Sequence, residues 1–179
     1  KAGNLIVSEI EENLLIASSL ALSLANIANA LPHEESLFFS TIPPLIDIKG
    51  FETIIAGGGI WHEPFQFDNK KERRSFFWGR NKDNGLEYFD DYNDLKGKGY
   101  HHEEWYVPAK YLKNNSFYWS QSYIDPYSNQ PMVTVTKPFF KDNKFNGVST
   151  VDLKLEGLKS LLDEQALLLG GKAFLLDRK

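Results

Sequence analysis

The first thirty residues carry a helical pattern of mostly apolar positions. The pattern runs through Ile6, Ile10, Asn13, Ala17, Leu20 and Leu24, and the apolar surface is widened by Leu14, Leu15, Leu22 and Ile27. A spacing of three or four residues is that of one helix face. Because a helix that is apolar on more than one side is buried on more than one side, we expect one face to pack on its own domain and another on a partner subunit. Pro32 ends the helix.

Residues 14–31 are free of charge and about long enough to span a bilayer. We do not interpret them as membrane-spanning, because serine and asparagine interrupt the stretch and no cationic residue flanks it at Pro32. The interrupting residues are Ser18, Ser19, Ser23, Asn26 and Asn29. Since the helical pattern begins at the first residue, Lys1, we expect the chain to come from a longer protein that is anchored in a membrane.

In the next segment the residue pattern changes from that of a helix to that of a strand. Residues 34–40 predict a short helix, and Pro43-Pro44 are expected to break it before another helical turn through Ile48. Residues 53–60 are β-branched and apolar but run into three glycines at 57–59. This strand must therefore bend or let another part of the structure approach closely.

Further strands follow along the chain. Asn84-Gly85 lie between the aromatic-rich stretches 75–80 and 86–92, which is a strong hairpin signal. The remaining predicted elements are a short helix at 103–112, a strand at 117–124, a hairpin of 132–140 with 145–155, a helix at 156–169 and a new strand at 172–177. Gly170-Gly171 stop the last helix.

This order predicts an α+β fold, with a long N-terminal helix and a PAS-like antiparallel sheet of about five strands. The size agrees, because 179 residues with 42% hydrophobic content suffice for one good core, or for one domain with a second attached. The last predicted strand has no partner within the chain, so we expect it to begin a second module.

Charge and composition exclude several classes of function. The formal net charge of −4 argues against a nucleic-acid surface. A local basic group is interpreted as a solvated strand edge and turn; it consists of Lys70, Lys71, Arg73, Arg74 and Arg80. The absence of cysteine excludes disulfides and thiolate metal sites. No nucleophile elbow, Walker loop, zinc-protease motif or dinucleotide fingerprint is present, so we predict neither an enzyme nor a cofactor.

Four motifs in order resemble a known family. They are Trp105-Tyr106 with Ala109, Ser122-Tyr123-Ile124-Asp125, Met132 to Pro138, and Gly147-Val148 followed by Val151-Asp152-Leu153. Together they resemble the membrane-distal module of the double Cache family, the extracellular sensors of chemoreceptors, sensor histidine kinases and diguanylate cyclases. Residues 172–177 resemble the first strand of that family's membrane-proximal module.

The resemblance implies a domain organisation and a function. It divides the chain into the N-terminal helices (1–50), the membrane-distal sensor module (51–155), and a connecting helix with the start of a membrane-proximal module (156–179). It implies a periplasmic domain of a bacterial inner-membrane receptor, which binds a small molecule in the distal module. It also implies a homodimer through the N-terminal helix, signalling by small helix shifts to a cytoplasmic output domain.

One departure from the family pattern changes the expected ligand. Family members that bind amino acids have an arginine two residues before the tryptophan, which grips the ligand carboxylate, and an aspartate in the last strand, which holds the amine. Trp105, Tyr106, Tyr123 and Asp152 stand at matching places, but the arginine position is Glu103. A carboxylate repels a carboxylate, whereas two acids among aromatic rings suit a cation. We therefore predict a small amine, polyamine or quaternary ammonium ligand.

Other side chains are weaker candidates for the same site. Residues 61–64 and 76–78 are expected to line the pocket or its lid, and Trp78 is counted among the predicted ligand-binding residues, although core packing explains these segments equally well. Asp152 shares a strand face with Val148 and Thr150, so it is either exposed or directed into a cavity.

Structural roles remain open for the other predicted site residues. Trp105 and Tyr106 could belong to the core, Tyr123 could anchor a turn, and Glu103 could face solvent at a helix start.

Three further hypotheses concern the kind of partner. The module could bind no small molecule and instead dock a periplasmic protein or act as a dimeric spacer. It could also bind a carboxylate through Arg73, Arg74 or Arg80. The run of His101 to Glu104 resembles a metal cluster, but neighbouring residues rarely chelate one ion, so we predict no metal site.

Overall fold

The computed structural model describes residues 2–168 and 170–172. The helices in this part of the chain are α1 (Ala2–Ala30), α2 (Glu35–Ile46) and α3 (Leu155–Leu168). The strands are β1 (Ile55–His62), β2 (Ser75–Arg80), β3 (Leu86–Phe89), β4 (Tyr118–Trp119), β5 (Tyr123–Ile124), β6 (Pro131–Lys141) and β7 (Lys144–Lys154). Three short 3₁₀ helices are η1 (Asp91–Asn93), η2 (Tyr100–His102) and η3 (Val107–Tyr111).

The strands form one antiparallel sheet. Its order is β3-β2-β1-β7-β6-β4, and β5 also pairs with β6. The pairing of β1 with β7 places Gly57 opposite Asp152 and Gly59 opposite Thr150. The predicted α+β class, with a long helix followed by an antiparallel sheet, is confirmed.

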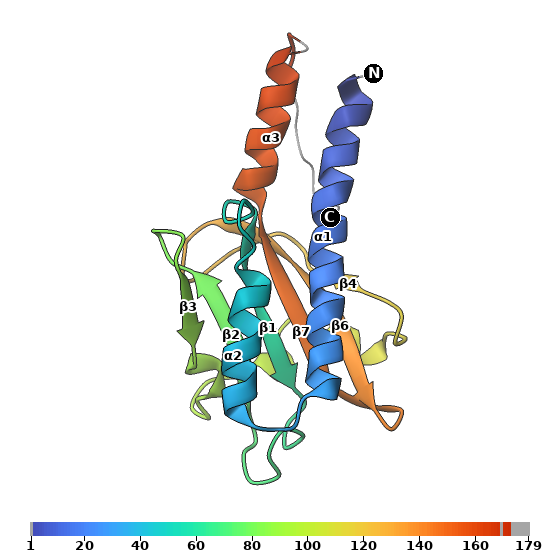
Figure 1. Ribbon diagram of the computed structural model, residues 1–179, viewed down its shortest axis with the longest axis vertical. Coiled ribbons are helices and arrows are strands. Elements are labelled where there is room, and N and C mark those ends of the chain that lie inside the picture. The colour runs from blue at the N-terminus through green and yellow to red at the C-terminus, as the bar shows by residue number, and fades with distance from the viewer. Residues whose placement is uncertain (1, 169, 173–179) are drawn as a thin grey trace.

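Two helices cover one face of the sheet (Figure 1). α1 lies over β6 and β7, where Ala17 and Ala21 are fully buried. Their small side chains bring the helix close enough for the Ser149 hydroxyl to donate a hydrogen bond of 2.6 Å to the Ala21 carbonyl. α2 packs on β1 and β2 through Phe38 and Ile42, which are also fully buried.

One side of the apolar stretch of α1 packs into the core of the domain. Ile10–Ala30 is long and apolar enough to cross a membrane by length and composition. Leu24 and Ala28 are nevertheless buried in the core cluster that joins the helices to the sheet. Beyond the sheet, α1 and α3 extend in the same direction (Figure 1).

The opposite face of the sheet is covered by irregular chain between β3 and β6. Trp61, Phe77 and Val148 from the strands pack there against Tyr100 and Tyr106 from the covering segment. The Tyr100 hydroxyl donates a hydrogen bond of 2.6 Å to the His62 carbonyl, which fixes the cover to β1. Every residue of β1 and β2 is buried, so both faces of these central strands are covered.

The prolines do not break the second helix, contrary to the prediction. Pro43 and Pro44 lie inside α2, which continues to Ile46. Because proline has no amide hydrogen, the carbonyl four residues before each proline receives no hydrogen bond within the helix. Those carbonyls belong to Phe39 and Ser40, which are exposed and therefore open to water.

Two predicted elements are more irregular than expected. The segment 103–112 is a turn followed by the 3₁₀ helix η3 rather than one helix. The predicted strand 117–124 is split into β4 and β5, because the hydroxyl of Ser120 accepts the Thr134 amide that a continuous ladder would use. The sheet therefore has seven strands rather than about five. The strand predicted at 172–177 lies outside the described residues beyond Lys172.

The predicted close approach at the glycines can be tested by adding one methyl group. A Cβ on Gly59 would collide with the Phe76 carbonyl oxygen of β2. We expect Gly59→Ala to lower the free energy of unfolding by about 1–3 kcal/mol, measured by urea denaturation. Gly171→Ala is the matched control, because a Cβ there meets nothing within 4 Å. Equal stability of the two variants would contradict the argument.

Candidate functional site

A small cavity of about 40 Å³ lies beneath the irregular cover of the sheet. Strands β1, β2, β6 and β7 supply its floor, and β5 with the covering loops supplies its walls. The lining residues are Trp61, Phe77, Tyr92, Trp105, Tyr123, Asp125, Pro126, Tyr127, Thr134, Thr150 and Asp152.

Asp152 is the polar centre of this cavity. Alternation along β7 directs Val151 and Leu153 into the core beneath the helices and places Thr150 and Asp152 on the cavity face. Asp152 is only 7% exposed. Of the two positions that the sequence allowed, exposed or directed into a cavity, the structure has the second.

Hydrogen bonds hold the floor of the cavity in place. The Thr134 hydroxyl donates to Asp152 Oδ1 at 2.7 Å, and the Tyr123 hydroxyl lies 2.9 Å from Thr134 Oγ1. Trp61 Nε1 donates to Thr150 Oγ1 at 2.8 Å. The carboxylate and the indole are therefore fixed before any ligand arrives, which reduces the entropy lost on binding.

The environment of Asp152 disfavours its charge. Burial raises the pKa of this carboxyl to about 6, hydrogen bonding with Thr134 and Tyr123 acts in the opposite direction, and nearby Asp125 raises it further. In the part of the chain that the structure describes, no lysine, arginine or histidine lines the cavity beside this carboxyl. The cavity thus holds an acid with a raised pKa and no cationic side chain in its lining.

Aromatic rings make up most of the cavity walls. Trp61 is central, with ring centroids 4.8 Å from Trp105, 5.1 Å from Tyr92 and 5.1 Å from Phe77. Tyr127 closes one side by packing against Phe89 at 4.5 Å. Such rings offer apolar surface and negatively polarised faces, to which cations are attracted.

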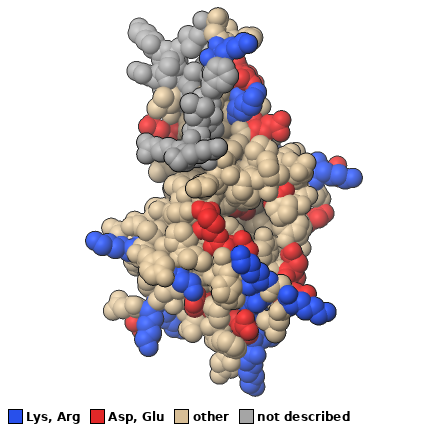
Figure 2. Space-filling model, turned by 180° about the vertical axis from the view of Figure 1, so that it is seen from behind, with Lys and Arg blue, Asp and Glu red and all other residues tan. Residues whose placement is uncertain are grey.

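The charges at the cavity are both negative. Asp125 and Asp152 contribute carboxyl groups, and no lysine, arginine or histidine is among the lining residues. Acidic side chains gather near the middle of this face of the molecule, and basic ones spread over its lower half (Figure 2). Asp125 also accepts hydrogen bonds of 2.7 Å from the amide and hydroxyl of Ser128, which fix the β5–β6 turn.

The structure brings together three of the predicted site residues. Trp105, Tyr123 and Asp152 all line the cavity. Tyr106 is fully buried beside it, and its hydroxyl donates to Glu63 at 2.7 Å. Glu103 is half-buried outside the lining, where its carbonyl accepts from the amides of Tyr106 and Val107, so it shapes the turn that carries Trp105.

Trp78 differs from the prediction, because it lies on the other face of the sheet. Alternation along β2 directs Phe77 into the cavity and Trp78 toward the helices. There its ring packs 5.4 Å from Phe39 of α2 and 5.1 Å from Tyr88 of β3. The predicted ligand contact is therefore corrected to a core contact.

Sequence reasoning missed several lining residues. Thr134 lies opposite Asp152 only because the register of β6 and β7 shifts between Phe139 and Phe140, and the sequence did not predict this shift. Tyr92 and Tyr127 lie in irregular segments, where no periodicity assigns a direction to a side chain. Asp125 was recognised as part of the motif Ser122-Tyr123-Ile124-Asp125, but it was not predicted to contact the ligand.

The arginines proposed for a carboxylate ligand are engaged elsewhere. Arg74 pairs with Glu35 and Asp90. Arg80 pairs with Asp47 and donates to the Ile55 carbonyl. None of the three arginines is among the residues that line this cavity. Arg80 lines a smaller cavity of about 10 Å³ that also contacts Asp125 and Asp152.

Metal ligation was also considered at sequence level. Among the residues that the structure describes, no group of three histidine, aspartate or glutamate side chains is arranged to hold a metal ion.

The fold is that of a family of sensor domains. The family described as the first PDC sensor domain of methyl-accepting chemotaxis protein-like proteins matches residues 50–160. The chain belongs to this family, which is one of sensor domains and not of enzymes. A comparison with curated protein sequences found no match.

Solved structures support the same fold. Methyl-accepting Chemotaxis protein X is similar with a TM-score of 0.71 and 17% identity, over 92% of this chain and 64% of that one. The extracellular domain of the putative histidine kinase soHK1S-Z6 gives 0.67 and 24%, over 87% and 58%. The ligand-binding domain of the Campylobacter jejuni chemoreceptor Tlp3 with L-valine gives 0.58 and 20%, over 87% and 57%. The chain thus spans less than two thirds of these relatives.

The raised pKa of Asp152 predicts a measurable cost to stability. A carboxyl whose pKa is higher in the folded state than in the unfolded state destabilises the fold as pH rises from about 4 to about 6, and this loss is complete above pH 6. We expect Asp152→Asn, which keeps a partner for Thr134, to be more stable than the wild type at pH 7 by about 1–3 kcal/mol.

Urea denaturation at pH 4, 5.5 and 7 measures this difference. The gain should be smallest at pH 4 and largest at pH 7. Asp142→Asn, in the exposed β6–β7 turn, controls for the loss of one negative charge. A gain that does not depend on pH would exclude the buried charge as its cause.

Proposed function

We propose that this domain senses a small ligand that carries an ammonium group, bound against Asp152. The observation that carries the proposal is a buried carboxyl next to a second carboxyl, inside an aromatic cavity whose described lining residues include no cation. An ammonium would supply the missing charge, donate hydrogen bonds to Asp152, and meet the faces of Trp61, Trp105 and Tyr92. Glu103, outside the lining, adds negative charge nearby, since it raises the pKa of Tyr92.

The size of the cavity indicates which part of the ligand it holds. A volume of about 40 Å³ suits an ammonium head group, whereas sites for whole small molecules usually measure about 300–1,000 Å³. A larger ligand therefore requires the cover to move outward. Tyr127 is the side chain best placed to move, because it is 41% exposed and belongs to the turn between β5 and β6.

A similar structure supports the ammonium part of this proposal. Tlp3 was solved with L-valine, an amino acid that has both an ammonium and a carboxylate. In this chain the cavity offers partners for the first group and no cation for the second. We therefore favour amines and quaternary ammonium compounds over amino acids.

We further propose that the domain works as a homodimer through α1. Leu15 and Leu22 are one heptad apart on this helix and are 66% and 40% exposed, on a different side from the buried Leu20 and Leu24. A second copy of α1 is the partner of matching shape and chemistry. Ligand-dependent shifts of α1 relative to the sheet would then be passed along the helix.

We place the domain in the periplasm of a membrane-anchored receptor. Its similarity to the extracellular domain of a histidine kinase and to chemoreceptors supports this location. Such a receptor would pass its signal to a kinase, a diguanylate cyclase or a chemoreceptor signalling domain. Residues 156–179 are proposed to lead into a membrane-proximal module.

A screen for thermal stabilisation tests the ligand class. We expect primary amines or quaternary ammonium compounds to raise the melting temperature by several degrees, because a ligand at a hundred times its Kd stabilises by about 2.7 kcal/mol. Asp152→Asn should abolish the effect, and Asp142→Asn should keep it. Since ionised Asp152 is the binding form, affinity measured by calorimetry should rise between pH 5 and pH 7.

Other outcomes of this screen lead to other functions. Stabilisation by carboxylates alone would contradict the proposal. A response that persists in Asp152→Asn would place the ligand elsewhere. No response to amines, amino acids, carboxylates or sugars would favour the remaining alternative, a module that docks a periplasmic protein or spaces the dimer.

The dimer is tested separately by sedimentation. Leu15→Glu combined with Leu22→Glu should shift the domain from dimer to monomer, while circular dichroism shows an unchanged fold. Ile124→Glu is the control, because Ile124 is 60% exposed on β5, away from α1. Dimerisation of the α1 variant with unchanged affinity would rule out this interface.

A further inference from the structure

The cavity at Asp152 and the smaller cavity beside it have one exposed side chain in common. The two share Phe77, Asp125, Tyr127 and Asp152 among their lining residues. Phe77 and Asp152 are buried and Asp125 is half-buried, whereas Tyr127 is 41% exposed. Tyr127 therefore lies between both cavities and the solvent.

A hydrogen bond holds Tyr127 in this position. Its hydroxyl donates to Asp91 Oδ2 of η1, and its ring centroid lies 4.5 Å from that of Phe89. Burial and the hydrogen bond to Asp91 raise the pKa of Tyr127 above its ordinary value, so the hydroxyl keeps its proton and remains a donor. The bond joins the β5–β6 turn to η1, and both segments supply residues to the cavity wall.

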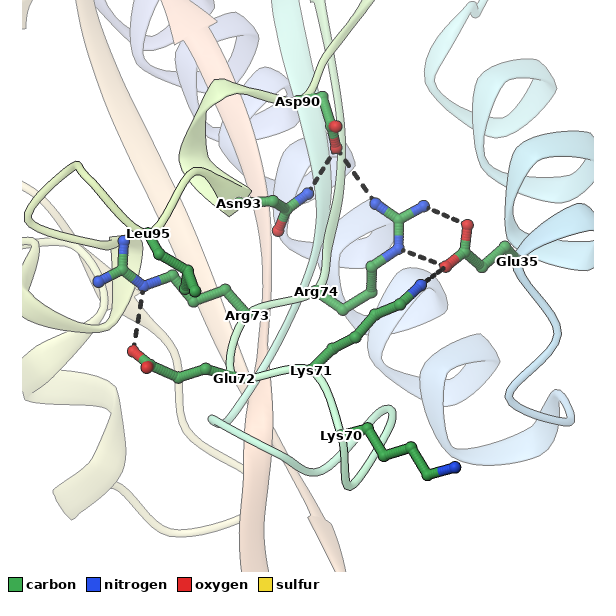
Figure 3. A pocket seen from close by; sticks show the side chains of 9 residues that line it. All are labelled: Glu35, Lys70, Lys71, Glu72, Arg73, Arg74, Asp90, Asn93 and Leu95. Carbon is green, nitrogen blue, oxygen red and sulfur yellow. Dashed lines mark hydrogen bonds and ion pairs between the residues drawn. The ribbon is translucent and has the colours of Figure 1, made fainter.

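The η1 side of this bond is anchored to the rest of the domain. Asn93 of η1 accepts a hydrogen bond of 2.7 Å from the amide of Ser75 in β2 and donates one of 2.7 Å to Asp90. Asp90 also accepts from Arg74 at 3.2 Å, and Arg74 pairs with Glu35 of α2 at 2.7 Å (Figure 3). These ion pairs line a separate cavity of about 420 Å³. They connect η1 to β2 and to α2, so η1 is a fixed support.

The other side of the bond is a turn that is held mainly by internal hydrogen bonds. Residues 125–130 connect β5, which is only two residues long, to β6. The amide and hydroxyl of Ser128 and the amide of Asn129 all donate to Asp125, so these bonds keep the shape of the turn. The bond from Tyr127 to η1 is different, because it connects the turn to another segment of the cover. When that bond breaks, the turn can move away from η1 as one unit.

We propose that Tyr127 is the gate of the ammonium site and limits the size of the ligand that this site admits. With the hydroxyl of Tyr127 bound to Asp91, the two cavities measure only about 40 and 10 Å³, which leaves room for an ammonium head group. A ligand with a larger body enters after this bond breaks. Selectivity then comes from exclusion of large ligands rather than from additional contacts with small ones. The limit on ligand size rests on the proposed ammonium function, whereas the gate can be tested without a ligand.

Hydrogen exchange in the ligand-free domain tests the gate, with the indole N–H of Trp61 as the reporter inside the cavity. Tyr127→Phe keeps the ring and removes the hydroxyl, so we expect this N–H to exchange about fivefold faster, measured by NMR. Asp91→Ala should act in the same direction, and the double variant should exchange no faster than the single ones, because all three remove one bond. The indole of Trp78, on the other face of the sheet, should keep its rate. Tyr111→Phe is the control variant, since Tyr111 is 85% exposed and lines neither cavity.

Calorimetry with two ammonium compounds tests the limit on ligand size. We expect the wild type to bind tetramethylammonium about tenfold more tightly than benzyltrimethylammonium, because the ring of the second compound collides with Tyr127. Tyr127→Ala should bring the two affinities to within about twofold of each other, since the variant lacks the ring that excludes the larger compound. Tyr111→Ala should keep the wild-type ratio.

The outcomes separate the gate from the ligand class. If neither compound binds, the ammonium function and the limit on ligand size are both contradicted, and the exchange rate of Trp61 decides on the gate alone. An unchanged rate at Trp61 in Tyr127→Phe would overturn the gate. Equal acceleration at Trp61 and Trp78 would also overturn it, because the substitution would then have loosened the whole fold. An affinity ratio that Tyr127→Ala leaves unchanged would overturn the limit on ligand size.

Discussion

Burial of the central strands on both faces is the constraint on which the rest of the structure depends. An antiparallel sheet often leaves one face to solvent, but β1 and β2 have no exposed position. α1 covers one face closely with small side chains such as Ala17 and Ala21, and α2 covers it with Phe38 and Ile42. The other face is covered by irregular chain, which fills space with large rings such as Tyr100 and Tyr106. The cavity at Asp152 is the space that this cover leaves unfilled.

The carboxylate of Asp152 in that cavity lowers the stability of the fold. Its presence therefore indicates a function other than folding. Folding would be served better by an uncharged residue at position 152, since burial raises the pKa of Asp152 toward neutrality. Thr134 and Tyr123 hold the carboxyl in place without neutralising it. The same network would make it an efficient partner for an incoming cation, because little reorganisation is needed. Across η1 the opposite arrangement occurs, where Arg73 is fixed by two carbonyls and pairs with the carboxylate of Glu72.

Burial of the central strands on both faces also helps to explain which structural features could be predicted from the sequence. Helix α1 and the β2–β3 hairpin at Asn84 follow from periodicity and turn chemistry, which are local. The direction of Asp152 follows from alternation, because a charged residue marks one face. Phe77 and Trp78 are both apolar, and with both faces buried, hydrophobicity cannot tell which of them reaches the cavity. The second carboxyl of the site was expected from Glu103 but comes from Asp125, because the position of a loop residue depends on long-range packing.

The glycines of β1 restrict how such a site can diversify. Gly57 and Gly59 lie on the cavity face, opposite Asp152 and Thr150, and a side chain at either position would collide with the backbone of β2. The floor is therefore nearly invariable on steric grounds. The walls are different, since Tyr92 and Tyr127 come from segments outside the sheet ladder and can be exchanged without disturbing strand pairing. New ligand preferences in a receptor of this kind would thus arise by substitutions in the cover, while the glycine-lined sheet beneath stays the same.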